Sequence, residues 1–391
     1  MIEIRPGSFI NKGGHLMAIA TVAALGKGAR FAAEPWIAPY ADRARLGLHQ
    51  KLWVRRLGPL AGLPAAAIPG RLRRTFGIVG EPDIDAVLDL SGFRYSDDDR
   101  YGARSANELA TNATRWHAGG SRVVLLPQAL GPFRSAAVRD PFLRALDAVD
   151  LVFARDRRSL AHLQELLPND ERVALAPDCT IALAADRPHD LAARVTPGAY
   201  AAIVPNDRML ERTSPAVQAA YPGFLLAAMS ALRDRGIEPV VVLHESRRDR
   251  AFVERLRLGG RPPSTIEEHD PLVLKGILGG AAVVLSSRYH ALVSALSQAV
   301  PVVATGWSHK YEELLADFGC SEQMLEVGTD HAPLLAAIER ATDRAGSSTG
   351  RDDLRERAMR QRFLVEAMWE RVRSVVGLPR AGVTEATDGP P

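Results

Sequence analysis

The sequence predicts an α/β protein with two Rossmann-like domains, and three observations support this fold class. Short apolar runs alternate with segments of helical periodicity along most of the 391 residues, which favours parallel sheets covered by helices. This length exceeds what one ordinary hydrophobic core requires, so two domains are expected. A break at 186–199, with Pro188, Pro197 and Gly198, indicates a linker between them.

The first domain is expected to span 1–185. A strand at 2–4 precedes the glycine turn Asn11-Lys12-Gly13-Gly14, which opens a helix at 15–25. Because the turn lacks the spacing of a dinucleotide site or a P-loop, it is either an anion-binding turn or simply a tight one. Prolines in 127–133 predict a loop there. The remaining strands are expected at 84–90, 122–126, 151–154 and 173–176, and the helices at 104–118, 136–148 and 156–167.

A basic insertion is expected at about 36–76, where arginines alternate with leucine and tryptophan and the regular pattern is lost. Such a stretch most often folds against its own domain. The alternative is a peripheral contact with a membrane surface or an anionic acceptor through 43–74.

The second domain is expected at 200–345 and repeats the alternation. It is followed by a long helix at 351–376 and a disordered tail at 377–391. Strands are expected at 201–204, 239–243, 283–285 and 302–304, and helices at 215–235, 247–256, 271–278, 291–299, 311–318 and 332–341. Two such domains facing each other across a cleft form the GT-B arrangement.

Composition narrows the class of protein. The 49 basic and 46 acidic residues are interspersed and leave a net charge of +3, which favours local anion-binding sites over a nucleic-acid surface. Two cysteines, Cys179 and Cys320, fit a reducing compartment and exclude a disulfide framework. Since no signal peptide and no apolar run of about 18 residues is present, a cytoplasmic enzyme is expected.

The most informative stretch is Ser286-Ser287-Arg288-Tyr289-His290, where a buried strand turns into a helix. Helix N–H groups and the helix dipole favour an anion at such a point. Arg288 adds a planar cation and His290 a titratable proton. The alternatives are an arginine that caps the sheet and a histidine satisfied in the core. Arg155 holds the same position after its own strand.

A second polar group is less promising. His244, Glu245 and Asp249 resemble metal ligands, but three candidates on one loop are a weak signal. We expect solvent-exposed polar residues there and no metal site.

Several motifs occur in the order found in the polysaccharide pyruvyl transferase family, which this chain resembles between residues 11 and about 319. They are Asn11-Lys12-Gly13, Asp89-Leu-Ser-Gly92-Phe, Pro127-Gln128-Ala-Leu-Gly-Pro-Phe, Ala154-Arg155-Asp156 with Ser159, Ala176-Pro177-Asp178, Arg288-Tyr-His290-Ala, and Pro301-Val-Val with Lys310. The family's Asn-x-Gly-Asp turn differs here, because Gly14 stands in the place of the aspartate.

The resemblance implies a GT-B-like fold and a reaction in which phosphoenolpyruvate donates a pyruvyl group to sugar hydroxyls as a ketal. Phosphoenolpyruvate is the co-substrate, no cofactor is implied, and the acceptor is a glycan or its lipid- or nucleotide-linked precursor. The rival functions are a nucleotide-sugar glycosyltransferase of the same architecture and a non-catalytic protein that binds glycan or phosphate.

The resemblance also implies roles for individual residues. His290 is the expected general acid, and Asp89 orients the acceptor or acts as base unless it caps a turn. Gln128, Asp178 and Asn11 serve the acceptor or the structure. The expected donor-binding residues are Arg288, Arg155, Lys310, Gly13 and Gly92.

Overall fold

The computed structural model describes residues 1–5, 9, 11–26, 28–53, 62–186, 195–257 and 259–380. The chain forms two compact units. The N-terminal unit comprises Met1–Ser8, Met17–Cys179 and Leu364–Pro391, and the C-terminal unit comprises Phe9–Leu16 and Thr180–Phe363. The glycine turn thus belongs to the C-terminal unit, although it lies near the start of the sequence.

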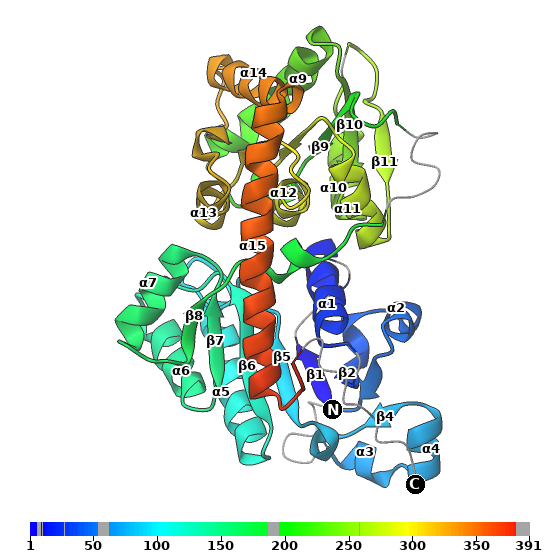
Figure 1. The fold of residues 1–391 in the computed structure, drawn as a ribbon, viewed down its shortest axis with the longest axis vertical. Helices are drawn as coiled ribbons and strands as arrows, with labels where there is room; N and C mark the ends of the chain where they lie inside the picture. The colour runs from blue at the N-terminus through cyan, green and yellow to red at the C-terminus, as the bar shows by residue number, and fades with distance from the viewer. Residues whose placement is uncertain are drawn as a thin grey trace. The chain divides into compact units, whose positions relative to one another are not determined.

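An eight-stranded sheet forms the centre of the N-terminal unit (Figure 1), in the order β4-β3-β2-β1-β5-β6-β7-β8. All its described strand pairs are parallel. The inner strands are buried along their length, as parallel strands covered on both faces must be, although β1 carries Glu3 and Arg5. The strands are β1 (Ile2–Arg5), β2 (Phe31–Ala33), β3 (His49–Lys51), β4 (Ile78–Val79), β5 (Ala86–Asp89), β6 (Arg122–Gln128), β7 (Leu151–Ala154) and β8 (Val173–Leu175).

Helices of this unit bury their apolar sides against the sheet. Leu109 and Trp116 of α5 and Phe142 of α6 join Val123 and Leu125 of β6 in one core. Figure 1 shows α5 and α6 side by side. The helices are α1 (Lys12–Leu25, shared with the C-terminal unit), α2 (Tyr40–Arg45), α3 (Leu63–Ala67), α4 (Gly70–Thr75), α5 (Gly102–Ala118), α6 (Ala136–Leu146) and α7 (Arg157–Leu166).

The C-terminal unit contains a six-stranded parallel sheet in the order β11-β10-β9-β12-β13-β14. Its strands are β9 (Tyr200–Val204), β10 (Glu238–Leu243), β11 (Thr265–Glu267), β12 (Val283–Ser286), β13 (Val302–Thr305) and β14 (Met324–Leu325). Its helices are α9 (Pro215–Asp234), α10 (Ser246–Val253), α11 (Pro271–Gly279), α12 (Tyr289–Leu296), α13 (Lys310–Asp317), α14 (Ala332–Gly346) and α15 (Ser348–Val375), the last shared with the N-terminal unit.

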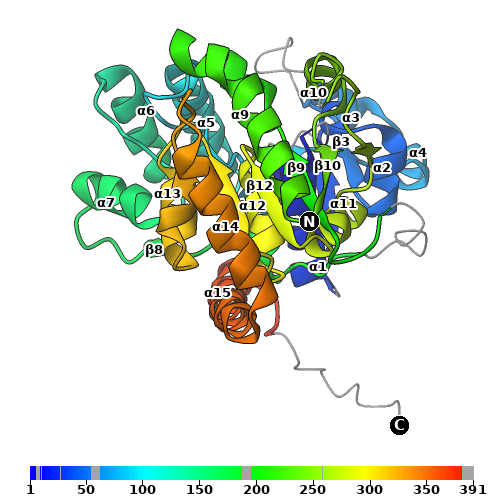
Figure 2. The same cartoon turned by 90° about the horizontal axis from the view of Figure 1, so that it is seen from above.

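Helix α9 lies beside α14 (Figure 2) and supplies much of this unit's core. By length and composition alone, α9 could cross a membrane. Its Tyr221, Phe224 and Leu225, however, pack in the core with Val241 of β10. Core packing therefore accounts for the apolar character of this helix.

The structure confirms the alternation of strands and helices, but it also contains strands that were not expected, among them β11 and β14 in the C-terminal sheet. Residues 31–79 supply the edge strands β2, β3 and β4, so the region of the basic insertion extends the sheet rather than lying against it. Strand β6 continues through Pro127 to Gln128, where a loop was expected, because the register with β7 shifts between Leu125 and Gln128. Of the expected linker and tail, residues 187–194 and 381–391 lie outside the described residues.

Buried charges hold the edge of the N-terminal sheet together. Lys51 of β3 and Glu3 of β1 form an ion pair in which both side chains are fully buried. Lys51 also pairs with Glu81. Arg5 pairs with Glu34 at 2.7 Å and with Glu3 at 3.3 Å. The carboxylate of Glu3 therefore depends on two cations from neighbouring positions in the sheet.

Lys51→Met should destabilise the protein by about 3–5 kcal/mol, because it leaves Glu3 buried with only part of its charge compensated. Arg104→Ala is a suitable control, since Arg104 pairs with Glu108 at the surface with its side chain 75% exposed. That change should cost at most about 0.5 kcal/mol. Both effects can be measured by guanidinium denaturation. An equal, small loss in the two variants would contradict a structural role for the buried pair.

Candidate functional site

Strand order reverses at one point in each sheet. In the N-terminal sheet the strands from β1 to β4 extend to one side and β5 to β8 to the other, so the reversal lies between β1 and β5. In the C-terminal sheet it lies between β9 and β12. Open parallel sheets bind ligands beyond the carboxyl ends of strands at such points. Asp89 ends β5 and Arg288 follows β12, so two predicted site residues lie at these reversals.

The turn between β12 and α12 is held in place by residues from other elements. The Tyr221 hydroxyl lies 2.6 Å from the Ser287 hydroxyl. The Ser287 carbonyl accepts hydrogen bonds from Asn206 Nδ2 at 2.9 Å and from the Tyr311 hydroxyl at 3.0 Å. Burial raises the pKa of Tyr221 to about 12, so this phenol keeps its proton at neutral pH. The position of Tyr289 and His290 at the start of α12 is therefore well defined.

Arg288 is surrounded by carboxylates. Its Nη1 lies 3.1 Å from Glu245, and its Nη2 lies 3.3 Å from Asp207 and also pairs with Asp249. Its Nε donates to the carbonyl of Pro205 at 3.1 Å. Arg288 is 6% exposed, and most of its N–H groups are occupied in this way, so the arginine binds the loops that follow β9 and β10.

His290 lies against the glycine turn. A Cβ atom on Gly13 would come within 2.1 Å of His290 Nδ1, so only glycine leaves room for the ring in this position. The Asn11 side chain accepts a hydrogen bond from the Gly13 N–H at 3.0 Å and caps the start of α1. The structure thus brings together three residues that the sequence analysis selected, from positions nearly 280 apart in the chain.

Two further basic side chains lie in the C-terminal unit. Lys12 is 9% exposed and donates a hydrogen bond to the carbonyl of His269. The ammonium of Lys310 lies 4.6 Å from the ring centre of Trp307, 5.5 Å from that of Tyr311 and 5.7 Å from that of Tyr289. Aromatic faces attract such a cation, so Lys310 is held beside the residue that precedes His290.

His244, for which the sequence analysis expects a solvent-exposed side chain, lies in the interior of the C-terminal unit. It follows β10, is 3% exposed, and its Nδ1 forms no hydrogen bond with the described residues. Burial, together with the nearby charges of Arg288, His290 and Lys12, lowers its pKa well below the ordinary value. The imidazole is therefore neutral near pH 7.

The expectation that His244, Glu245 and Asp249 are solvent-exposed was wrong. His244 and Asp249 are buried and Glu245 is half-buried, because Arg288 draws both carboxylates inward. Among the described residues, no group of three or more histidine, cysteine or acidic side chains is arranged to hold a metal ion.

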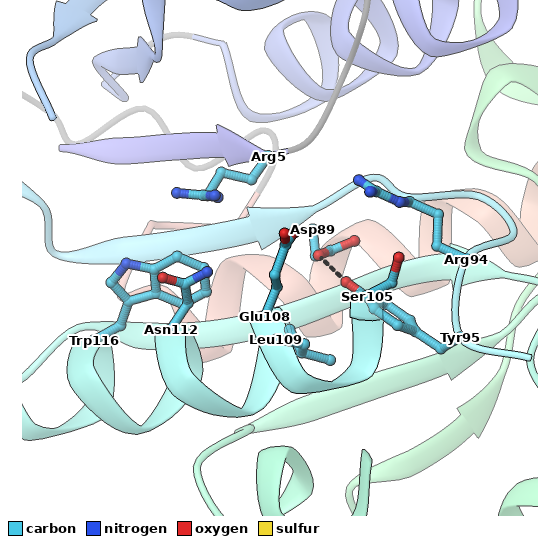
Figure 3. Close-up of a pocket in the computed structure, with 9 residues that line it drawn as sticks. All are labelled: Arg5, Asp89, Arg94, Tyr95, Ser105, Glu108, Leu109, Asn112 and Trp116. Atoms are coloured by element: carbon cyan, nitrogen blue, oxygen red, sulfur yellow. Dashed lines mark hydrogen bonds between the residues drawn. The ribbon is translucent and has the colours of Figure 1, made fainter. Parts of the chain in front are cut away.

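Asp89 lines a small polar cavity in the N-terminal unit (Figure 3). Its carboxylate accepts hydrogen bonds from the Ser91 N–H and the Tyr95 hydroxyl, both at 2.8 Å. Burial raises the pKa of Asp89 above its usual value, although these hydrogen bonds oppose the shift. Ser105 Oγ and Trp116 Nε1, also on the cavity wall, are buried and form no hydrogen bond with the described residues. The cavity therefore has unused polar groups and room for about 30 Å³ of solvent or a small ligand group.

The remaining predicted residues lie around the ends of β5 to β8. Gly92 has a φ of +73°, which favours glycine, and its carbonyl accepts a hydrogen bond from Ala129 at 2.9 Å. Arg155 and Asp178 form a buried ion pair at 3.1 Å. Gln128 is fully buried, and neither polar atom of its amide is hydrogen-bonded to a described residue. Whether Gln128 serves the acceptor or the structure stays a prediction.

The residues that sequence reasoning missed share one signal. Asn206 and Asp207 come within a few positions of the end of β9, as His244 does for β10 and Arg288 for β12. They gather because these three strands are neighbours in the sheet. Strand order, which the sequence pattern does not reveal, was the missing information.

His244 should make the stability of the protein depend on pH. Its pKa is near the ordinary 6.5 in the unfolded chain and well below that value in the folded protein. The unfolded state therefore binds more protons below pH 6.5, and stability that is present above this pH falls as the pH drops, by up to about 1.4 kcal/mol per unit.

His244→Gln should remove this part of the pH dependence, measured by denaturant unfolding between about pH 7.5 and 5.5. The exposed His117, at the end of α5, offers the matched control His117→Gln. If wild type and His244→Gln lose stability equally on acidification, the histidine is not kept neutral by the fold.

Several solved structures share this fold at low sequence identity. Anabaena HepE in complex with UDP-glucose is 15% identical, with a TM-score of 0.57, covering 96% of this chain and 98% of that chain. S. aureus MnaA with UDP is 12% identical, with a TM-score of 0.58 and 97% of both chains covered. The UDP-GlcNAc 2-epimerase of Neisseria meningitidis, bound to UDP-GlcNAc, is 13% identical, with a TM-score of 0.56 and coverage of 96% and 100%. These likenesses establish a GT-B-type fold with two Rossmann-like units.

The sequence identifies the family more narrowly than the fold does. No curated protein matches the chain significantly. The family model for polysaccharide pyruvyl transferase matches residues 11–309, which include the glycine turn, Asp89, Arg288 and His290. Because this match spans about three quarters of the sequence, the chain belongs to the polysaccharide pyruvyl transferase family.

Proposed function

We propose that the protein transfers the pyruvyl group of phosphoenolpyruvate to hydroxyls of a glycan, or of its lipid- or nucleotide-linked precursor, as a ketal. The observation that carries the proposal is the contact of His290 with the glycine turn, in a chain of the polysaccharide pyruvyl transferase family. The contact sets a titratable group beside the start of α1, where backbone N–H groups favour an anion. Phosphoenolpyruvate carries two anionic groups and serves as the co-substrate, without a metal or other cofactor.

The donor's charges are assigned to the basic groups around His290. Lys12 and Lys310, together with the first N–H groups of α1 and α12, are the proposed ligands of its phosphate and carboxylate. The carboxylates on Arg288 favour a bracing role in which it holds the α12 turn in place. Arg155, paired with Asp178, has a similar bracing role in its own unit.

The proposed chemistry begins with proton transfer from His290 to the methylene carbon of phosphoenolpyruvate. The adjacent carbon becomes an oxocarbenium-like centre, and a sugar hydroxyl attacks it while losing its proton to a base. The carbon–oxygen bond to phosphate then breaks, and its electron pair leaves with phosphate. A second hydroxyl attacks the same carbon, which completes the ketal. Of the two hydroxyl protons, one balances the proton placed on the methyl group and the other leaves with phosphate.

Asp89 is the proposed base for the acceptor hydroxyl. Its raised pKa makes it a stronger base than an ordinary aspartate, and the cavity beside it has the unused donors of Ser105 and Trp116. A sugar hydroxyl is a small polar group that suits such a cavity.

A nucleotide-sugar glycosyltransferase is the second candidate, because the HepE and MnaA structures hold UDP-glucose and UDP. That function needs an acidic group or a ribose contact at the ligand. The described carboxylates that follow β9 and β10, Asp207, Glu245 and Asp249, are instead bound to Arg288. This arrangement favours a small anionic donor over a nucleotide sugar.

Donor choice and two variants test the proposal together. The wild type, incubated with phosphoenolpyruvate and a panel of glycosyl acceptors, should release phosphate and add pyruvate to an acceptor by mass. His290→Ala and Asp89→Asn should each lower turnover by about 10²-fold or more, while both still bind phosphoenolpyruvate by calorimetry. Transfer from a nucleotide sugar without any pyruvate adduct would establish the second candidate. Full turnover in His290→Ala would remove this histidine from the acid role.

Gly13→Ala should lower turnover by about 10²-fold, because the added methyl group displaces the His290 ring, and small misplacements of a catalytic group have effects of this size. Gly223→Ala introduces the same methyl group where no atom lies within 4 Å, and should leave turnover unchanged. Steady-state kinetics with phosphoenolpyruvate measure both, and thermal unfolding shows whether each variant is folded. Equal turnover in the two variants would contradict a positioning role for Gly13.

A further inference from the structure

Exposed apolar side chains are concentrated in one part of the N-terminal unit. Four of the ten exposed large hydrophobic side chains among the described residues lie between positions 36 and 76, about a tenth of the chain. They are Trp36, Tyr40, Leu72 and Phe76, which are 59%, 68%, 46% and 60% exposed. Single exposed apolar residues are ordinary, but a local group of them indicates a site that contacts another protein, a membrane or a ligand.

The four side chains come from two neighbouring segments. Trp36 and Tyr40 lie in and just before α2, and Leu72 and Phe76 lie in and just after α4. Gln50 connects the segments, because it accepts a hydrogen bond from Arg43 of α2 at 3.3 Å and donates one to the carbonyl of Phe76 at 3.1 Å. Figures 1 and 2 both show α2 and α4 at the same margin of this unit.

Positive charge surrounds the apolar group. Arg45, Arg71 and Arg74 are exposed and form no ion pair with any described residue. Other described basic side chains of this region have partners: Arg43 donates to the Ala38 carbonyl, Lys51 pairs with Glu3, and Arg73 pairs with Asp83. Among the described residues of this region, the exposed arginines without an ion pair therefore lie in the same two helices as Tyr40 and Leu72.

We propose that this basic–aromatic patch, formed by Trp36, Tyr40, Leu72, Phe76, Arg45, Arg71 and Arg74, docks on an anionic lipid surface. Tryptophan and tyrosine favour the boundary between headgroups and acyl chains, because their rings are apolar with one polar end. Phenylalanine and leucine insert below them, and arginines bind lipid phosphates. The inference goes beyond the proposed function and does not depend on it.

A second copy of the chain fits this patch less well. A twofold contact would place the same surface on both sides and would bring the three arginines close to their own copies. An anionic bilayer compensates all of them at once.

Flotation of the full-length protein with vesicles tests the proposal. The protein should bind vesicles that contain phosphatidylglycerol, bind pure phosphatidylcholine vesicles much less, and dissociate as salt is raised. Removing two arginines in Arg71→Ala/Arg74→Ala should weaken binding to anionic vesicles by about 10- to 30-fold. Trp36→Ala/Phe76→Ala should weaken binding to the same vesicles even at low salt, because it removes the inserted side chains.

Matched controls come from the same unit. Tyr101→Ala removes an aromatic ring that is 46% exposed, and Arg104→Ala removes an arginine whose side chain is 75% exposed, both outside the patch. These variants should bind as the wild type does. Thermal unfolding checks that each patch variant is folded. Equal binding to neutral and anionic vesicles, or equal binding by patch and control variants, would overturn the proposal. A change of oligomeric state in the patch variants with vesicle binding intact would assign the surface to a second copy instead.

Discussion

The arrangement of loops in the C-terminal unit depends on the ion pairs of one buried arginine, Arg288. The Arg288 guanidinium is buried where strand order reverses, and a buried cation is tolerated only when carboxylates and hydrogen-bond acceptors surround it. Asp207 from the loop after β9, with Glu245 and Asp249 from the segment after β10, meet this requirement. These ion pairs bring together the segments that follow β9, β10 and β12, and His290 lies just beyond Arg288 at the start of α12. The ion pairs that compensate the buried charge of Arg288 thus also set the geometry of the candidate site.

The N-terminal unit also has buried charged side chains at the point where its strand order reverses. Arg5 ends β1 and Asp89 ends β5, and each is supplied with partners from nearby segments: Glu3 and Glu34 for the arginine, Ser91 and Tyr95 for the aspartate. The two units differ in which polar groups are left without hydrogen-bond partners among the described residues. The acids around Arg288 are occupied by it, whereas the cavity beside Asp89 has the polar atoms of Ser105 and Trp116 to offer. This contrast is why we assign the anionic donor to the basic groups near His290 and the acceptor hydroxyl to Asp89.

The sequence predicted the surroundings of some residues and not of others, for physical reasons. Gly13 and His290 were selected separately, and their contact was not expected, because it joins the first helix to a unit formed mainly by residues 180–363. His244 and Asp249 were interpreted as surface residues, because a polar loop after a strand usually is one. Their burial follows from ion pairing with a side chain about 40 positions away. Lys51 falls within the range expected for the basic insertion, yet it lies inside the sheet, where its cation pairs with Glu3.

The sequence by itself determined the fold class, the order of most strands and helices, the family, and the positions of Asp89, Arg288 and His290 at strand ends. These follow from local periodicity and short motifs, which need only neighbouring residues. Tertiary structure decided which strand ends meet, and therefore which side chains surround Arg288, why position 13 has to be glycine, and which basic residues reach the surface. Such choices depend on strand order and on compensating each buried charge, and both involve residues far apart in the chain.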